Sequence, residues 1–173
     1  KYGLMRSING GESWFLDNDT DFPMSWERMA IAVCPSFPQK VYVVFNGETM
    51  INGTYKGCFK STNYGASFIL MSDTPNVFGW ELDGNDGDDQ GSRDLSFIVD
   101  PTNSSRIFAG GVNIWKSENE GDSWSRETWW THNYVPIDPF VHSDQQHFYW
   151  KGNALYTVND GGIFKTTDFG NSW

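Results

Sequence analysis

The chain has few cysteines, few basic residues and no long apolar run, and each shortage excludes a class of protein. Only 12 Lys and Arg residues stand against 22 Asp and Glu, which gives a formal net charge of −10. Nucleic acids and anionic membrane surfaces are both held by basic side chains, so this charge argues against either partner. No apolar stretch approaches the roughly 20 residues of a membrane span. A signal-peptide pattern is also lacking.

The two cysteines, Cys34 and Cys58, are too few for a zinc site, because no CxxC pair and no further thiol accompany them. They either form a disulfide or remain as two buried thiols. The sequence leaves both alternatives open.

Helical periodicity is also lacking, since no segment shows apolar residues at the spacing of an amphipathic helix. Aromatic residues make up 17% of the chain, and 18 residues are Gly. This composition suits short strands joined by many turns. We therefore expect an all-β fold.

The most informative pattern present is an octapeptide, Ser/Thr-x-Asp/Asn-x-Gly-x-Ser-aromatic, which occurs four times. The Asp or Asn accepts hydrogen bonds from backbone amides ahead of it, and the Gly supplies a positive φ. Each copy follows a short apolar run, so each unit is expected to be two strands joined by a tight polar turn. The defining residues are Ser7, Asn9, Gly11, Trp14, Ser61, Asn63, Gly65, Phe68, Ser117, Asn119, Gly121, Trp124, Thr166, Asp168, Gly170 and Trp173.

This octapeptide resembles the Asp-box, or bacterial-neuraminidase repeat, with Phe68 in place of Trp in the second copy and Thr166 in place of Ser in the fourth. The resemblance implies a structural turn at the rim of a β-propeller, away from the ligand face. The four copies therefore indicate a fold rather than a chemistry.

Successive octapeptides begin roughly 50 residues apart, which is the length of a four-stranded propeller blade. Apolar runs separated by polar turns fill each interval, as in residues 30–34 and 41–45. The prediction is a β-propeller segment of about three four-stranded blades.

The expected division places the end of one blade at residues 1–17, whole blades at 18–72 and 73–128, and an incomplete blade at 129–173. Propellers usually close with four or more blades. The chain starts with Lys and stops on the Trp of an octapeptide. We therefore expect a part of a larger propeller, with the remaining blades as its first partners.

Several further stretches point to a more specific group of propellers. Among them are Gln90-Gly91-Ser92-Arg93-Asp94-Leu95, Pro139-Phe140-Val141-His142-Ser143-Asp144 and Asn159-Asp160-Gly161-Gly162. They resemble the propellers of large secreted Bacteroidetes proteins that carry type IX secretion sorting domains. Sortilin-type and xyloglucanase-type propellers are more distantly similar. The resemblance implies an extracellular or outer-surface location, with glycans, surface proteins and the secretion machinery as candidate partners.

Acidic residues crowd the connection at residues 80–91. Such carboxylates repel one another and need cations, hydrogen-bond donors or solvent. Hard oxygen ligands of this kind suit Ca²⁺, although the Gly positions do not fit an EF-hand loop. The prediction is a Ca²⁺ site, and the alternative is a solvated acidic loop. The candidate ligands are Asp83, Asn85, Asp86, Asp88 and Asp89.

Two other groups contain metal-ligating side chains. Residues 17–21 alternate carboxylates but lack the Gly of a Ca²⁺ loop. His142, Asp144 and His147 either bind a transition metal or hold a strand and turn by hydrogen bonds to the backbone. The second alternative is favoured for the histidines, because no fourth ligand is evident.

Exposed aromatic side chains are expected in the connections between blades, at Trp80, Trp129, Trp130 and Tyr134. Aromatic rings can stack on sugars or anchor a protein partner. The alternative is packing against a neighbouring blade.

Two functions remain open from the sequence. The first is a binding or scaffolding module for a glycan or protein ligand. The second is part of a glycoside hydrolase, whose two carboxylates would lie across a cleft. Asp83, Asp86, Asp88 and Asp94 are candidates for one of that pair, and a sialidase-type Arg triad is not evident. We predict the binding module.

Overall fold

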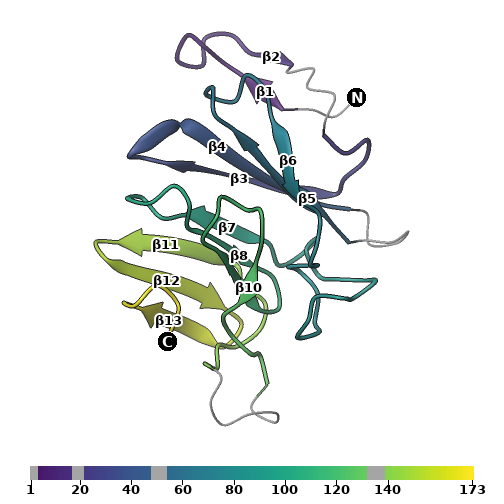
Figure 1. Ribbon diagram of the computed structural model, residues 1–173, viewed down its shortest axis with the longest axis vertical. Coiled ribbons are helices and arrows are strands. Elements are labelled where there is room, and N and C mark those ends of the chain that lie inside the picture. The colour runs from purple at the N-terminus through teal and green to yellow at the C-terminus, as the bar shows by residue number, and fades with distance from the viewer. Residues whose placement is uncertain (1–3, 17–21, 48–53, 132–138) are drawn as a thin grey trace.

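The computed structural model describes residues 4–16, 22–47, 54–131 and 139–173 (Figure 1). Within these ranges every regular element is a strand, and the strands form four antiparallel sheets. The described residues accordingly contain no helix long and apolar enough to cross a membrane. The predicted all-β fold is confirmed.

The first four-stranded sheet follows the chain order without a crossover. Its second strand is buried along most of its length, because one face packs on the second four-stranded sheet and the other packs with Phe22 and Trp26 of the preceding connection. This explains why its sequence is a continuous apolar run rather than an alternation. The strands are β3 (Arg28–Cys34), β4 (Phe37–Asn46), β5 (Tyr55–Ser61) and β6 (Ile69–Ser72).

The second four-stranded sheet repeats this order with shorter strands. The strands are β7 (Ser96–Val99), β8 (Ile107–Gly110), β9 (Ile114–Ser117) and β10 (Ser125–Arg126).

Two smaller sheets lie at the ends of the chain. One pairs β1 (Met5–Arg6) with β2 (Phe15–Leu16). The other contains β11 (His147–Lys151), β12 (Ala154–Asn159) and β13 (Gly162–Thr166). Each of the four sheets falls inside one of the blade ranges expected from the sequence.

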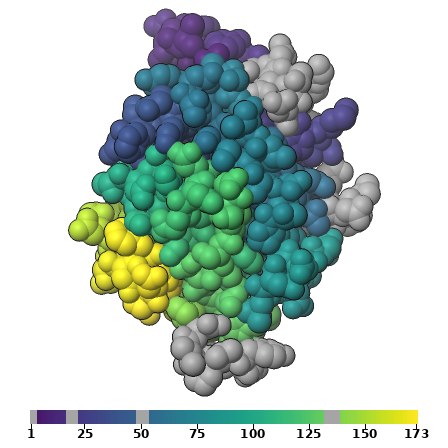
Figure 2. Space-filling model, in the orientation of Figure 1, coloured from purple at the N-terminus to yellow at the C-terminus, as the bar shows by residue number. Residues whose placement is uncertain are grey.

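The sheets are arranged in succession, from β1 and β2 at the top of Figure 1 to β11–β13 at the bottom. The first strands of the three larger sheets, β3, β7 and β11, lie next to one another. Figure 2 shows the sheets packed side by side without a break. This is the arrangement of consecutive propeller blades around an axis.

The apolar core fills the spaces between sheets. Val44, Val77, Phe78 and Ala109 are each wholly buried between the β3–β6 and β7–β10 sheets. Phe108 belongs to a similar cluster between β7–β10 and β11–β13. Burying one such side chain stabilises a protein by about 1.5–3 kcal/mol. The association of sheets, rather than any single sheet, therefore holds the segment together.

Each octapeptide is a turn closed by its own side chains. In the second copy, the amide of Gly65 donates to Ser61 Oγ over 2.9 Å, and the amide of Ser67 donates to Asn63 Oδ1 over 2.9 Å. Tyr64 and Gly65 adopt positive φ values of 61° and 78°. The turn connects β5 to β6, and the other copies occupy the corresponding places after β1, β9 and β13.

The two cysteines are free thiols. Cys34 Sγ donates to the carbonyl oxygen of Asp100 over 3.2 Å, which links two neighbouring sheets. Burial raises the pKa of the Cys58 thiol far above its usual range, although Lys60 acts in the opposite direction. Of the two alternatives left open by the sequence, the buried thiols are the one observed.

Candidate ligand-binding site

The ends of the sheets form two different faces. In both four-stranded sheets an octapeptide joins the third strand to the fourth at one end, which we call the octapeptide face. Because neighbouring strands are antiparallel, the chain must leave each fourth strand at the opposite end. There it enters the connections at residues 73–95, 127–131 and 139–146, which together with the β8–β9 turn at 111–113 form the connection face.

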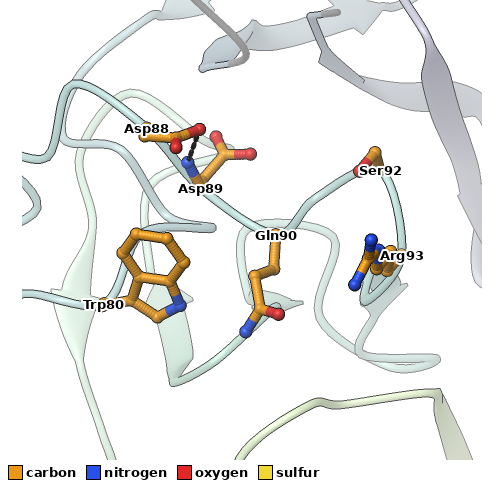
Figure 3. Close-up of a pocket in the computed structure, with 6 residues that line it drawn as sticks. All are labelled: Trp80, Asp88, Asp89, Gln90, Ser92 and Arg93. Atoms are coloured by element: carbon orange, nitrogen blue, oxygen red, sulfur yellow. Dashed lines mark hydrogen bonds between the residues drawn. The ribbon is translucent and has the colours of Figure 1, made fainter. Parts of the chain in front are cut away.

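An open pocket of about 190 Å³ lies on the connection face (Figure 3). Every residue that lines it belongs to the connection between β6 and β7. The lining residues are Trp80, Asp88, Asp89, Gln90, Ser92 and Arg93.

The connection that carries the pocket is held by its own hydrogen bonds. Asn76 Nδ2 donates to the carbonyl oxygens of Asp86 and Asp88, over 3.3 and 3.4 Å. The Asn76 amide donates to the carbonyl oxygen of Gly84 over 2.8 Å, where a φ of 65° turns the chain. Phe78 of the same connection is wholly buried and anchors it in the core between the two sheets. The backbone around the pocket is therefore set before any ligand arrives.

Three acidic side chains of this connection bind donors close to them in sequence. Asp83 accepts hydrogen bonds from the amide and side chain of Asn85, and these bonds lower the pKa of Asp83. Asp86 Oδ2 accepts the Glu81 amide over 2.9 Å, and Asp88 Oδ1 accepts the amide of residue 89 over 2.9 Å. These three carboxylates therefore bind donors within their own connection.

The described residues contain no group of three or more His, Cys, Asp or Glu side chains gathered as a metal site. Calcium binding by Asp83, Asn85, Asp86, Asp88 and Asp89 stays a prediction.

Of the other two candidate metal sites, only the one at His142, Asp144 and His147 lies within the described residues. Residues 17–21 lie outside the described residues. His142 Nδ1 lies 3.3 Å from the carbonyl oxygen of Ser143, and Asp144 Oδ1 accepts Gln90 Nε2 over 3.2 Å. His147 is exposed at the start of β11. These contacts correspond to the structural alternative rather than to a shared ligand set.

Asp89 differs from the other acidic residues because it is buried, with only 4% of its surface exposed. Its Oδ1 accepts hydrogen bonds from Asn46 Nδ2 over 2.7 Å and from the Gly91 amide over 3.0 Å. Its Oδ2 has no hydrogen-bond partner in the described part of the chain. Burial raises the pKa of Asp89, although the bonds from Asn46 and Gly91 act in the opposite direction.

Two of the four predicted aromatic residues are partly exposed on the connection face. Trp80 and Trp130 are each 39% exposed. The buried side chain of Asn113 links them, because its Nδ2 donates to the Trp80 carbonyl over 3.4 Å and its Oδ1 accepts the Trp130 amide over 3.2 Å. Trp129 is buried, which is the packing alternative, and Tyr134 lies outside the described residues.

A polar cluster beside the pocket joins the first strands of the three larger sheets. Arg28, at the start of β3, donates to the carbonyl oxygens of Ser92, Arg93 and Leu95. Asp94 Oδ1 accepts Gln146 Nε2 over 2.7 Å. Burial raises the pKa of Asp94, and the nearby acidic residues 144 and 160 act in the same direction. The cluster fixes the pocket-bearing connection against both neighbouring sheets.

Sequence reasoning did not single out several residues that build this site. Gln90, Ser92 and Arg93 line the pocket, Asn46 binds Asp89, and Asn113 links the backbones of Trp80 and Trp130. The run of polar residues at 90–94 was a signal in the sequence. No sequence pattern marked Asn46 or Asn113, because their hydrogen-bond partners are distant along the chain.

No protein-family model and no curated protein sequence matches the chain. Among solved structures, it is similar to the GH74 enzyme of Niastella koreensis, with 22% identity and a TM-score of 0.62, over 98% of this chain and 26% of that one. An ancestral GH74 enzyme gives 18% identity and a TM-score of 0.57, over 99% and 21%. YCF48 from Cyanidioschyzon merolae gives 16% identity and a TM-score of 0.47, over 87% and 38%.

The chain spans about a quarter of the length of the two GH74 enzymes. At these identities the likeness shows the fold, which is a segment of a β-propeller.

Proposed function

We propose that this chain is a glycan-binding module of a larger β-propeller, and that the pocket beside Trp80 is its binding site. The observation that supports this is the pairing of a half-exposed indole with carboxylate, amide, hydroxyl and guanidinium groups around one pocket. A sugar ring presents an apolar face to an aromatic side chain and hydroxyl groups to polar ones.

Two further features support a saccharide ligand. Trp130 offers a second partly exposed aromatic surface, and Asn113 links its backbone to that of Trp80. The connection is already ordered by internal hydrogen bonds, which reduces the entropy lost on binding. The net charge of −10 favours neutral or cationic saccharides over anionic ones.

The proposal extends to the setting of the module. Ile31, Val33 and Tyr149, on first strands of the sheets, are 52%, 45% and 59% exposed. Apolar side chains near a propeller axis suit contact with further blades, which we propose as the first partners. The sequence resemblance to secreted Bacteroidetes propellers supports an extracellular or outer-surface location, with type IX secretion as the route and surface proteins as further partners.

A glycoside hydrolase is the second candidate, and the fold shared with two GH74 enzymes favours it. In that case Asp88 or Asp89 would supply one carboxylate of the pair, and another part of the propeller the second. Chromatography of an oligosaccharide incubated with the protein separates the two functions. Shortened products support hydrolysis, and an unchanged oligosaccharide supports binding alone.

Calorimetric titration with neutral oligosaccharides tests the binding proposal. The substitution Trp80→Ala removes the exposed indole and is expected to weaken binding about tenfold. Trp14→Ala is the matched control, because Trp14 is also exposed but lies in the first octapeptide turn. Equal binding by wild type and the Trp80 variant contradicts the proposed site.

A further inference from the structure

The three larger sheets share a pair of side chains on the face that lies away from the preceding sheet, which we call the forward face. An aromatic residue of the second strand lies directly beside a lysine of the third strand, and this lysine immediately precedes the octapeptide. The pairs are Tyr42 and Lys60, Phe108 and Lys116, and Tyr156 and Lys165. Because the three positions are equivalent, the contacts of the first two pairs indicate what the third pair is built to bind.

In the first two of these sheets, the next sheet covers the forward face. Tyr42 and Phe108 are wholly buried. Tyr42 packs with Val99 and Ile107 of the β7–β10 sheet, and Phe108 packs with Leu155 of the β11–β13 sheet. An aromatic residue at this position therefore lies inside an interface between sheets.

The lysine of each covered pair binds the octapeptide of the next sheet. Lys60 Nζ donates to Glu120 Oε2 over 2.8 Å, and Lys116 Nζ donates to the carbonyl oxygen of Phe169 over 3.2 Å. Glu120 and Phe169 are both the fourth residue of their octapeptides. A charged hydrogen bond therefore joins consecutive sheets at one repeated position.

The third forward face, on the β11–β13 sheet, is open. Figure 1 shows this sheet at the end of the succession, opposite β1 and β2. Tyr149, which lies beside Tyr156, is 59% exposed, and Val158 and Ile163 of the same face are 38% and 72% exposed. Lys165 is exposed, and no acceptor for its Nζ lies among the described residues. Apolar side chains gathered on one exposed face are typical of a surface that binds a partner.

We propose that the forward face of β11–β13 binds a further octapeptide-bearing sheet, and that the fourth residue of its octapeptide accepts a hydrogen bond from Lys165. The acceptor is a side-chain carboxylate, as at Glu120, or a backbone carbonyl, as at Phe169. This inference rests on the proposed setting in a larger propeller, and it names the surface and the contact that join the next blade.

A complete sheet fits this surface better than a second copy of the chain. At the two existing interfaces the first strands contact each other, β3 against β7 and β7 against β11. The first strand of the partner should therefore cover Tyr149 of β11. The sheet at the other end of the described residues, β1–β2, consists of the two strands that flank an octapeptide, and it supplies no first strand.

Acetylation of lysines followed by mass spectrometry tests whether Lys165 is covered, because a buried, hydrogen-bonded amine reacts more slowly than an exposed one. Lys60 and Lys116 are the internal references, with side chains 13% and 11% exposed. In the 173-residue chain, Lys165 should react about tenfold faster than these two. In the native protein purified from its source, it should react as slowly as they do. Fast reaction of Lys165 in both samples overturns the inference.

The substitution Lys165→Glu reverses the charge at the proposed contact, and the same substitution in the 173-residue chain is its matched control. The melting temperature of the native protein should fall by about 2–4 °C, whereas that of the chain alone should stay the same, because Lys165 is exposed there. An equal change in both samples shows that no partner is involved and overturns the inference. Labelling of the wild type decides the question if the native variant does not fold.

Two further results would identify a different occupant and overturn the inference. One is a dimer of the 173-residue chain, seen by light scattering, in which Lys165 is protected. The other is protection in the native protein by a partner whose sequence lacks the octapeptide pattern. The pocket beside Trp80 lies on another connection, so either result leaves the glycan-binding proposal intact. A native protein that is a monomer of these residues, with Lys165 reactive, overturns both this inference and the proposed larger propeller.

Discussion

The octapeptide face and the connection face differ in how their polar side chains find hydrogen-bond partners. In the four octapeptides, the Gly amide donates to the first hydroxyl over 2.8, 2.9, 2.9 and 2.9 Å, so one geometry is repeated. On the connection face, Asn46 and Asp89 keep buried oxygens without partners. The octapeptide turns bind their own hydroxyl, amide and carboxylate groups in one repeated geometry, whereas the polar groups of the connection face depend on partners far along the chain, as Asp89 depends on Asn46. The first face therefore specifies the fold, and the second is the place to look for function.

In the fourth octapeptide, local hydrogen bonds stabilise even a charged side chain. Asp168 replaces the Asn of the other copies and accepts hydrogen bonds from Ser172 and Thr166. These bonds lower the pKa of Asp168 to about 2. The charge is thus held by the same local donors that an amide oxygen uses elsewhere, and it requires no external ligand.

The largest loss of stability is expected from adding a methyl group to an octapeptide glycine. Gly121 has a φ of 90°, and a Cβ there would lie 2.7 Å from Cys58 Sγ of the preceding sheet. Gly121→Ala combines backbone strain with a buried clash, and it is expected to lower the free energy of unfolding by about 3 kcal/mol. Urea denaturation followed by tryptophan fluorescence measures this loss.

The matched control lies on the connection face. A Cβ at Gly87 would have no atom within 4 Å, so Gly87→Ala is expected to change stability by less than about 0.5 kcal/mol. Similar losses in both variants would show that the octapeptides are not the more constrained face.

A smaller effect is expected from the salt bridges that tie the third octapeptide to the preceding sheet. Glu120 binds both Lys40 and Lys60, the second over 2.8 Å. Burial raises the pKa of Glu120, but the two lysines outweigh it, and the net pKa is lowered. Glu120→Gln is expected to cost about 1 kcal/mol at neutral pH, because the glutamate is only partly exposed and has two partners.

The pH dependence of this effect follows from the lowered pKa. The contribution of Glu120 is present above the pKa of the unfolded chain, and it is lost as the pH falls through the lower pKa of the folded protein. Thermal unfolding of wild type and Glu120→Gln should therefore give midpoints that converge in acid. A constant difference between the two midpoints would assign the effect to shape rather than charge.

The two faces also differ in how much the sequence revealed. The octapeptide turns were predictable because their hydrogen bonds join residues two to four positions apart, such as Ser61, Asn63 and Gly65. Local bonds of this kind leave a fixed pattern in the sequence. The strands of the core were predictable from apolar runs such as that of β4.

The pocket depended on contacts that no local pattern records. Asn46 reaches Asp89 across 43 positions, and Asn113 reaches Trp80 across 33. Such pairs exist only after the sheets have packed. The sequence pointed to the acidic connection and to exposed indoles, but it did not separate the buried Asp89 from its solvated neighbours or Trp130 from the buried Trp129.

An effect no larger than that of Glu120→Gln is expected from calcium binding to the acidic connection, and it separates the two faces by a ligand rather than by a substitution. If the predicted residues, from Asp83 to Asp89, bind calcium with the weak affinity of extracellular sites, millimolar calcium stabilises the folded protein by about 1 kcal/mol. The melting temperature should then rise by about 2–4 °C. Asp83→Asn should reduce the rise, and Asp122→Asn, on the octapeptide face, should leave it intact. An unchanged melting temperature would contradict the calcium prediction, because the internal donors of Asp83, Asp86 and Asp88 would then suffice.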